Sequence, residues 1–203
     1  MKKGLLVIVS GPSGAGKGTV LKQVFEKYPN LKLSISVTTR DPRVGEVDGI
    51  NYYFKTVEEY KEMLKKDEFL EHQEVYGNFY GTPKAKVFEQ LDKGFDVVLE
   101  IDVKGALSVM QRYPEAISIF VSPQDRDTLA SRLKGRGSER PEDLERRISE
   151  AAAEIQQANL YDYIVVNNDV TECAEDVISI VRAEKCSVKL NRKFIDSLTN
   201  GGK

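Results

Sequence analysis

Short apolar runs alternate with amphipathic stretches along most of this 203-residue chain. The runs are nearly continuous, as in strands that are buried on both faces of a parallel sheet, and they lie at residues 5–9, 32–37, 96–101, 116–121 and 163–167. Helical spacing or capping signals between them predict helices at residues 18–28, 57–66, 83–93, 123–134, 141–159 and 171–185. The pattern therefore predicts a doubly wound α/β fold, in which helices flank a five-stranded parallel sheet.

Two segments depart from this alternation. Residues 40–81 hold many aromatic residues and turn glycines but only one clear helix, which suggests a small inserted β-rich lobe. Residues 132–147 are dense in arginine, with Gly135 and Gly137 among the cations. A charge run of this kind is either a solvated helix face or a mobile lid, and the glycines favour the lid. We therefore expect a lobe at 40–82, a lid at 132–147 and a core of residues 1–39, 83–131 and 148–203.

A glycine-rich turn directly after the first apolar run carries the clearest chemical signal. In order, its residues are Gly11, Pro12, Ser13, Gly14, Ala15, Gly16, Lys17, Gly18 and Thr19. The glycines permit left-handed turns, so successive N–H groups converge on one anion, and the following helix adds its N-terminal N–H groups. Lys17 supplies a mobile positive charge for the β- and γ-phosphates. An ordinary turn is the alternative, but the strand, lysine and helix favour a nucleoside triphosphate site.

Composition narrows the class of protein. Thirty basic residues against 32 acidic ones give a net charge of −2, so no basic field favours a nucleic-acid partner. The apolar runs are too short to span a membrane, and the single His72 excludes a multi-histidine metal site. Cys173 and Cys186 lack metal-site spacing, so free thiols in a reducing cytoplasm are expected, with a disulfide as the alternative.

Several motifs in order give a specific resemblance. Residues 36–46 read SVTTRDPRVGE, and they are followed by Asn51-Tyr52-Tyr53-Phe54, Glu71, the segment GNFYGT at 77–82, and Glu100-Ile101-Asp102. With the phosphate loop, these motifs closely resemble the guanylate kinase family over about residues 4–184. The resemblance implies a P-loop NTPase-type core with a GMP-binding lobe and an Arg-rich lid. It also implies transfer of a phosphoryl group from ATP to GMP, and to dGMP as a further acceptor, with Mg²⁺, in purine nucleotide metabolism and GMP recycling.

Four residues are expected to hold the phosphate of GMP. Arg40 and Arg43 offer planar forks that match phosphate oxygens, and Tyr52 and Tyr80 can add hydroxyl donors. The resemblance places all four at this phosphate. Taken singly, the arginines could be solvated at the surface and the tyrosines could serve packing.

Guanine recognition is expected from two carboxylates and two hydroxyls. Guanine presents N1–H and N2–H donors and an O6 acceptor, which match a carboxylate and a hydroxyl. By resemblance, Glu71 and Glu100 are the carboxylates, and Ser36 and Thr82 supply the hydroxyls. The family often has Asp where this chain has Glu100. Glu71 could alternatively be a surface carboxylate that follows helix 57–66.

The remaining expectations concern ATP and its metal ion. Gly18 stands where phosphate loops usually carry a Ser or Thr ligand to Mg²⁺, so phosphates, waters and Thr19 would hold the ion. Asp102 either orders Mg²⁺ through water or caps the next helix. Phosphoryl transfer needs no strong general base, and resemblance gives Lys17, Arg136 and Arg147 the transferring phosphate, with Arg132 in the same cluster. Asn168 either holds adenine or forms an Asx turn.

Two other functions fit parts of the sequence. A non-catalytic scaffold module would usually have a degraded phosphate loop, whereas Gly16 and Lys17 are intact here. A kinase for another acceptor would lack the guanine pattern of Glu71 and Thr82. Residues 189–203 carry no motif and could form a helical extension, an assembly contact or a frayed tail. The sequence leaves open whether the chain is a monomer or a homo-oligomer.

Overall fold

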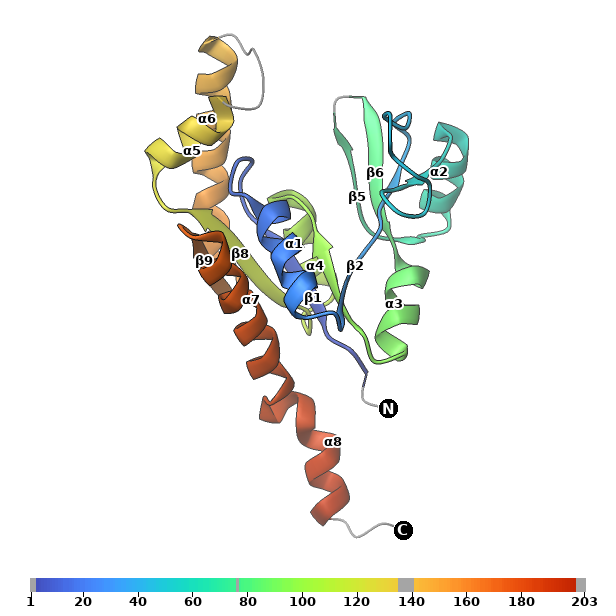
Figure 1. The fold of residues 1–203 in the computed structure, drawn as a ribbon. Coiled ribbons are helices and arrows are strands. Elements are labelled where there is room, and N and C mark those ends of the chain that lie inside the picture. The colour runs from blue at the N-terminus through green and yellow to red at the C-terminus, as the bar shows by residue number, and fades with distance from the viewer. Residues whose placement is uncertain (1–2, 76, 135–140, 200–203) are drawn as a thin grey trace.

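A five-stranded parallel sheet forms the centre of the computed structural model, which describes residues 3–75, 77–134 and 141–199 (Figure 1). Its order is β2-β7-β1-β8-β9, and all four strand pairs are parallel. The strands are β2 Leu31–Leu33, β7 Asp96–Glu100, β1 Leu6–Ser10, β8 Ile117–Pro123 and β9 Tyr163–Asn167. The predicted five-stranded parallel sheet is therefore confirmed.

Helices cover both faces of this sheet. The helices α1 Lys17–Lys27 and α7 Val170–Lys185 pack with Val7 and Val9 into one core. On the other face, α3 Lys84–Asp92 and α4 Val103–Arg112 pack with Leu6 and Ile8 into a second core. Neighbouring residues of a strand point to opposite faces, which explains why β1 is apolar at every position but its last.

A second sheet of four strands lies beside the first (Figure 1). Its order is β4-β3-β6-β5, with β4 Tyr53–Phe54, β3 Val37–Thr38, β6 Asn78–Pro83 and β5 Phe69–Val75. Helix α2 Val57–Lys65 covers this sheet through Tyr60, which is stacked on Phe69 and Phe79. Thr56 and Glu59 form a capping box at the start of α2.

One predicted strand is divided in the structure, and several predicted helices have other bounds. The expected strand at 32–37 is divided, because β2 pairs with β7 in the first sheet whereas β3 pairs with β4 and β6 in the second. The helix expected at 123–134 begins at Arg126, because Pro123 ends β8. The expected helix at 83–93 begins one residue later, because Pro83 ends β6 and serves as the N-cap of α3. The chain thus crosses between the sheets at residues 34–36 and again at Pro83.

The remaining helices flank the phosphate loop or extend from the core. Helices α5 Arg126–Lys134 and α6 Pro141–Gln156 pack together, and the turn η1 Gln157–Leu160 follows α6. Figure 1 shows this pair on one side of the loop that precedes α1, with the second sheet on the other. Helix α8 Val188–Thr199 continues from α7. None of the described helices is long and apolar enough to cross a membrane.

Candidate active site

Backbone geometry shapes the phosphate loop between β1 and α1. Gly11, Gly14 and Gly16 have φ angles of 144°, 86° and 87°, a region that side chains disfavour. A Cβ at Gly11 would lie 2.1 Å from the Val121 carbonyl oxygen, so a larger residue would not fit there. Lys17 folds back over the loop, where its Nζ donates to the carbonyl oxygens of Gly11 at 2.6 Å and Pro12 at 3.2 Å.

Residues distant in sequence brace this loop from outside. Asn167 Nδ2 donates to the Ala15 carbonyl oxygen at 2.7 Å, and the Arg132 guanidinium donates to the carbonyl oxygens of Ala15 and Asn167 at 3.3 and 3.2 Å. Arg147 reaches Ser13 Oγ at 3.2 Å. Sequence reasoning missed Asn167, although it lies next to Asn168, which is exposed beyond β9. Asn167 is fully buried. Its burial beside the phosphate loop is seen only in the structure, so no signal in the sequence indicates its contact with Ala15.

One cavity of about 550 Å³ brings together residues that were predicted to bind ATP and residues that were predicted to bind GMP. Its lining combines the phosphate loop with the second sheet and the end of β7. The predicted residues among its walls are Gly11, Ser13, Gly14, Gly16, Lys17, Ser36, Tyr52, Glu71, Tyr80, Glu100 and Asp102. Sequence reasoning did not identify four further lining residues, which are Gln73, Val75, Ile101 and Glu154.

Glu71 is the most deeply buried carboxylate of this cavity. Its exposed fraction is 4%, so the alternative of a surface carboxylate is wrong. Thr82 Oγ1 donates to Glu71 Oε1 at 2.6 Å, whereas Oε2 is buried and has no partner among the described residues. Burial raises the pKa of Glu71 to about 7, and the nearby Asp102 adds to the rise. The unpartnered oxygen is an acceptor for a ligand that carries N–H groups.

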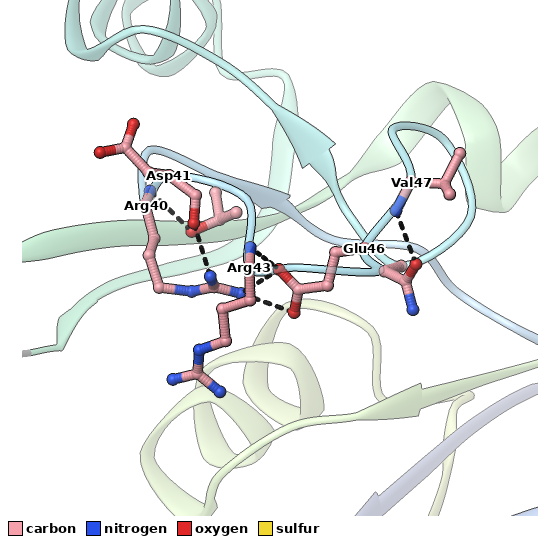
Figure 2. A network of polar contacts seen from close by, with 7 residues as sticks. Arg40, Asp41, Arg43, Glu46 and Val47 are labelled. Atoms are coloured by element: carbon pink, nitrogen blue, oxygen red, sulfur yellow. Dashed lines mark hydrogen bonds and ion pairs between the residues drawn. The ribbon is translucent and has the colours of Figure 1, made fainter.

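Arg40 is held in a fixed position by Glu46, as Figure 2 shows. Its guanidinium donates to both Glu46 oxygens at 2.9 Å and to the Asp41 carbonyl oxygen at 2.6 Å. The bond to Glu46 raises the pKa of Arg40. Arg40 Cζ lies 5.6 Å from the centroid of the Tyr52 ring. The ring centroids of Tyr52 and Tyr80 are 6.1 Å apart. Three of the four predicted phosphate ligands therefore form one cluster.

The fourth predicted ligand, Arg43, is positioned through its backbone. Its N–H donates to Glu46 Oε2 at 2.8 Å, while its guanidinium projects away from Glu46 (Figure 2). Glu46 therefore organises both arginines. The SVTTRDPRVGE motif contains Glu46, but its role becomes visible only when the loop folds back on itself.

The oxygen atoms that line the cavity near the phosphate loop are suited to bind a hard cation. Asp102 and Glu100 line the cavity with carboxylates, and oxygen ligands are those that Mg²⁺ prefers. Asp102 caps α4 by accepting from the Gly105 N–H at 2.8 Å. Thr19 is exposed in the first turn of α1. The described residues contain no group of three His, Cys, Asp or Glu ligands, so phosphates and water would supply most of the coordination.

The other predicted residues of the phosphate loop are not part of the cavity lining. Pro12 and Ala15 are buried parts of the loop, whereas Gly18 is exposed near the Glu100 carboxylate. Arg136 and the middle of the expected lid, residues 135–140, lie outside the described part of the chain. Cys173 is buried and Cys186 is exposed, and both are free thiols, as expected.

Comparisons with known proteins agree with this geometry. The guanylate kinase family model matches residues 3–184. Guanylate kinase of Caldanaerobacter subterraneus subsp. tengcongensis is 50% identical over 191 residues, which are 94% of this chain and 93% of that relative. Guanylate kinase of Clostridium perfringens strain 13 is 48% identical over 96% of this chain and 91% of its own length. The crystal structure of guanylate kinase from Anaplasma phagocytophilum superposes with a TM-score of 0.75 at 33% identity, covering 95% of this chain and 96% of that one. The chain therefore belongs to the guanylate kinase family.

Proposed function

We propose that this chain transfers the γ-phosphoryl group of ATP to GMP, giving ADP and GDP. The observation that carries the proposal is the shared cavity, because it places the phosphate loop opposite the buried Glu71–Thr82 pair. Membership of the guanylate kinase family supports the same reaction. The substrates and the free thiols favour a cytoplasmic enzyme.

The base of GMP is read by Glu71 and its neighbours. Glu71 accepts the N1–H and N2–H groups of guanine, and Glu100 at the end of β7 adds a second acceptor. The Thr82 hydroxyl has one hydrogen, which it donates to Glu71, so Thr82 orients the carboxylate and Ser36 remains as the donor to O6. Adenine would leave these groups mismatched, at a cost of about 1–3 kcal/mol for each unpaired group.

The phosphate of GMP is held by Arg40, Arg43, Tyr52 and Tyr80. Glu46 fixes the Arg40 guanidinium beside the two tyrosine rings, so the donors are positioned before the substrate binds. This arrangement supports a site for a tetrahedral dianion. The lobe at residues 40–82 is proposed to contribute most of these groups.

The reaction is an in-line displacement at the γ-phosphorus. An oxygen of the GMP phosphate forms a new bond to this phosphorus, while the bond to the β–γ bridging oxygen breaks and ADP leaves with the electron pair. The attacking oxygen is already anionic, so no general base is needed. Lys17, Arg147 and the proposed lid residue Arg136 offset the charge of the transferring group, and Gly11–Thr19 cradle the ATP phosphates. Asn168 is proposed to contact adenine.

Mg²⁺ would neutralise phosphate charge when bound. Asp102 is the proposed ligand through water, and Thr19 is the other candidate. Asp102 already caps α4, so its side chain is held at the cavity before the ion arrives.

A coupled assay of ADP formation tests the proposal. GMP, dGMP, AMP, CMP and UMP are offered in turn with ATP and Mg²⁺. We expect GMP to exceed AMP by at least about 30-fold in kcat/KM, the ratio that two mismatched groups give. Lys17→Ala should abolish turnover with unchanged thermal stability. A non-catalytic module would show no turnover with any acceptor, and a kinase of other specificity would prefer AMP or a pyrimidine nucleotide.

A further inference from the structure

One polar side chain on the cavity wall has no role in the proposed reaction. Gln73 on β5 is half-buried and lines the cavity. A primary amide both donates and accepts hydrogen bonds, yet none of the hydrogen bonds among the described residues involves the Gln73 side chain. Its amide is therefore available to a ligand in the cavity.

Gln73 stands next to two groups with proposed roles in GMP binding. It is two residues beyond Glu71 on β5, and both side chains line the cavity. Across the sheet, Gln73 is paired with Tyr80 of β6, and residues directly opposite each other in an antiparallel pair share a face. The amide therefore adjoins both the carboxylate proposed for the base and the hydroxyl proposed for the phosphate.

The ribose of a nucleotide lies between its base and its phosphate. With the base at Glu71 and the phosphate at Tyr80, the sugar faces the part of the wall that holds Gln73. The next cavity residue on β5 is the apolar Val75, which offers no hydrogen bond. We propose that Gln73 is a specificity residue that binds the 2′-hydroxyl of GMP and so favours GMP over dGMP. This inference rests on the proposed function, because Glu71 and Tyr80 supply its frame of reference.

The test compares GMP with dGMP in wild type and Gln73→Met. Methionine keeps the length of glutamine but cannot donate and is a weak acceptor. We expect kcat/KM for GMP to fall about three- to tenfold, as for the loss of one neutral hydrogen bond, while the value for dGMP changes less than twofold. Calorimetric binding of the two nucleotides should show the same difference. The matched control is Gln111→Met at an exposed position of α4, which should alter neither value.

The outcomes separate the two proposals. An equal loss for GMP and dGMP, or no loss for either, would overturn the role of Gln73. A wild-type protein that phosphorylates neither nucleotide would instead overturn the proposed function. Gln73→Ala repeats the comparison without introducing a new side chain, so that a poorly folded methionine variant does not decide the result.

Discussion

Burial determines the chemistry of Glu71 at the scale of the single residue. The motif around it allowed its role to be predicted by resemblance, but not its protonation. The pKa of about 7 arises because β5 pairs with β6 while the N-terminus of α4 closes over the carboxylate. A Cβ at Gly105 of α4 would lie 3.1 Å from Glu71 Oε2. Asp102 and Gly105 lie more than thirty positions from Glu71, so no local pattern in the sequence indicates their contact with it.

We expect GMP binding to weaken as the pH falls below about 7. Guanine presents two donors, so it binds the ionised carboxylate, and below pH 7 the folded protein must release a proton from Glu71 before it binds. Thr82 and Asp102 are the polar groups that act on Glu71, and neither removes this cost. The Kd for GMP should rise by up to about tenfold per pH unit.

Calorimetry between pH 5.5 and 8 measures this dependence, with Glu71→Gln as the control. The GMP phosphate titrates near pH 6 in both proteins, so only the difference between their slopes belongs to Glu71. Equal slopes in wild type and variant would show that Glu71 keeps its charge throughout.

Glu46→Gln should weaken the use of GMP, the phosphoryl acceptor, and leave the binding of ATP, the phosphoryl donor, unchanged. The substitution removes the charge that holds Arg40 and the Arg43 N–H. We expect kcat/KM for GMP to fall about two- to fivefold, because the contact is partly solvated, while KM for ATP stays within twofold. Glu58→Gln on the exposed side of α2 is the matched control. A similar loss for ATP would show that Glu46 does not serve the acceptor phosphate alone.

At the scale of the element, the apolar runs predicted β1, β7 and β8 because these strands are buried on both faces. Helix α4 was missed, although Val103, Ala106 and Val109 recur at helical spacing and are buried. The sequence indicated this helix only through the alternative that Asp102 caps it, and the structure confirms that cap. The division of residues 32–37 was not predictable from periodicity, since both β2 and β3 carry apolar residues and differ only in their partners.

Asp96 accepts hydrogen bonds from four residues, and we expect Asp96→Asn to destabilise the fold. This fully buried carboxylate accepts from the Leu5 N–H at 2.9 Å, Tyr28 Oη at 3.1 Å, Asn30 Nδ2 at 3.2 Å and Lys185 Nζ at 2.6 Å. An amide would lose the charge opposite Lys185 and place a donor among donors. The free energy of unfolding should fall by about 2–4 kcal/mol in urea titrations.

Asp92→Asn on α3 provides the comparison for this measurement. Asp92 is exposed and pairs only with Lys3 among the described residues, so its substitution should change stability by less than about 0.5 kcal/mol. Equal effects of the two substitutions would mean that the Asp96 network adds nothing beyond a surface ion pair. The partners of Asp96 lie 66 to 91 positions away, so no local pattern of residues indicates the network.

At the scale of the whole molecule, the active site exists because two sheets meet. The phosphate loop belongs to the first sheet and the Glu71–Thr82 pair to the second, and one cavity contains residues of both. The sequence predicted each part from its own motif. The bracing of the loop by Arg132 and Asn167 was not predictable, because these residues reach Ala15 from 117 and 152 positions away.

Two separate subsites within one cavity should respond separately to mutation. A ligand at 100 times its Kd stabilises a protein by about 2.7 kcal/mol, which corresponds to a rise in Tm of roughly 5–10 °C for a chain of this size. We expect Lys17→Ala to keep the shift caused by GMP and lose the shift caused by ATP. Glu71→Gln should keep the shift caused by ATP and reduce the shift caused by GMP, because Glu71 lies on β5 while Lys17 begins α1. Thermal unfolding of both variants with each nucleotide measures the four shifts. Loss of both shifts in either variant would contradict independent subsites, and it would show that the two sheets bind their nucleotides as one unit.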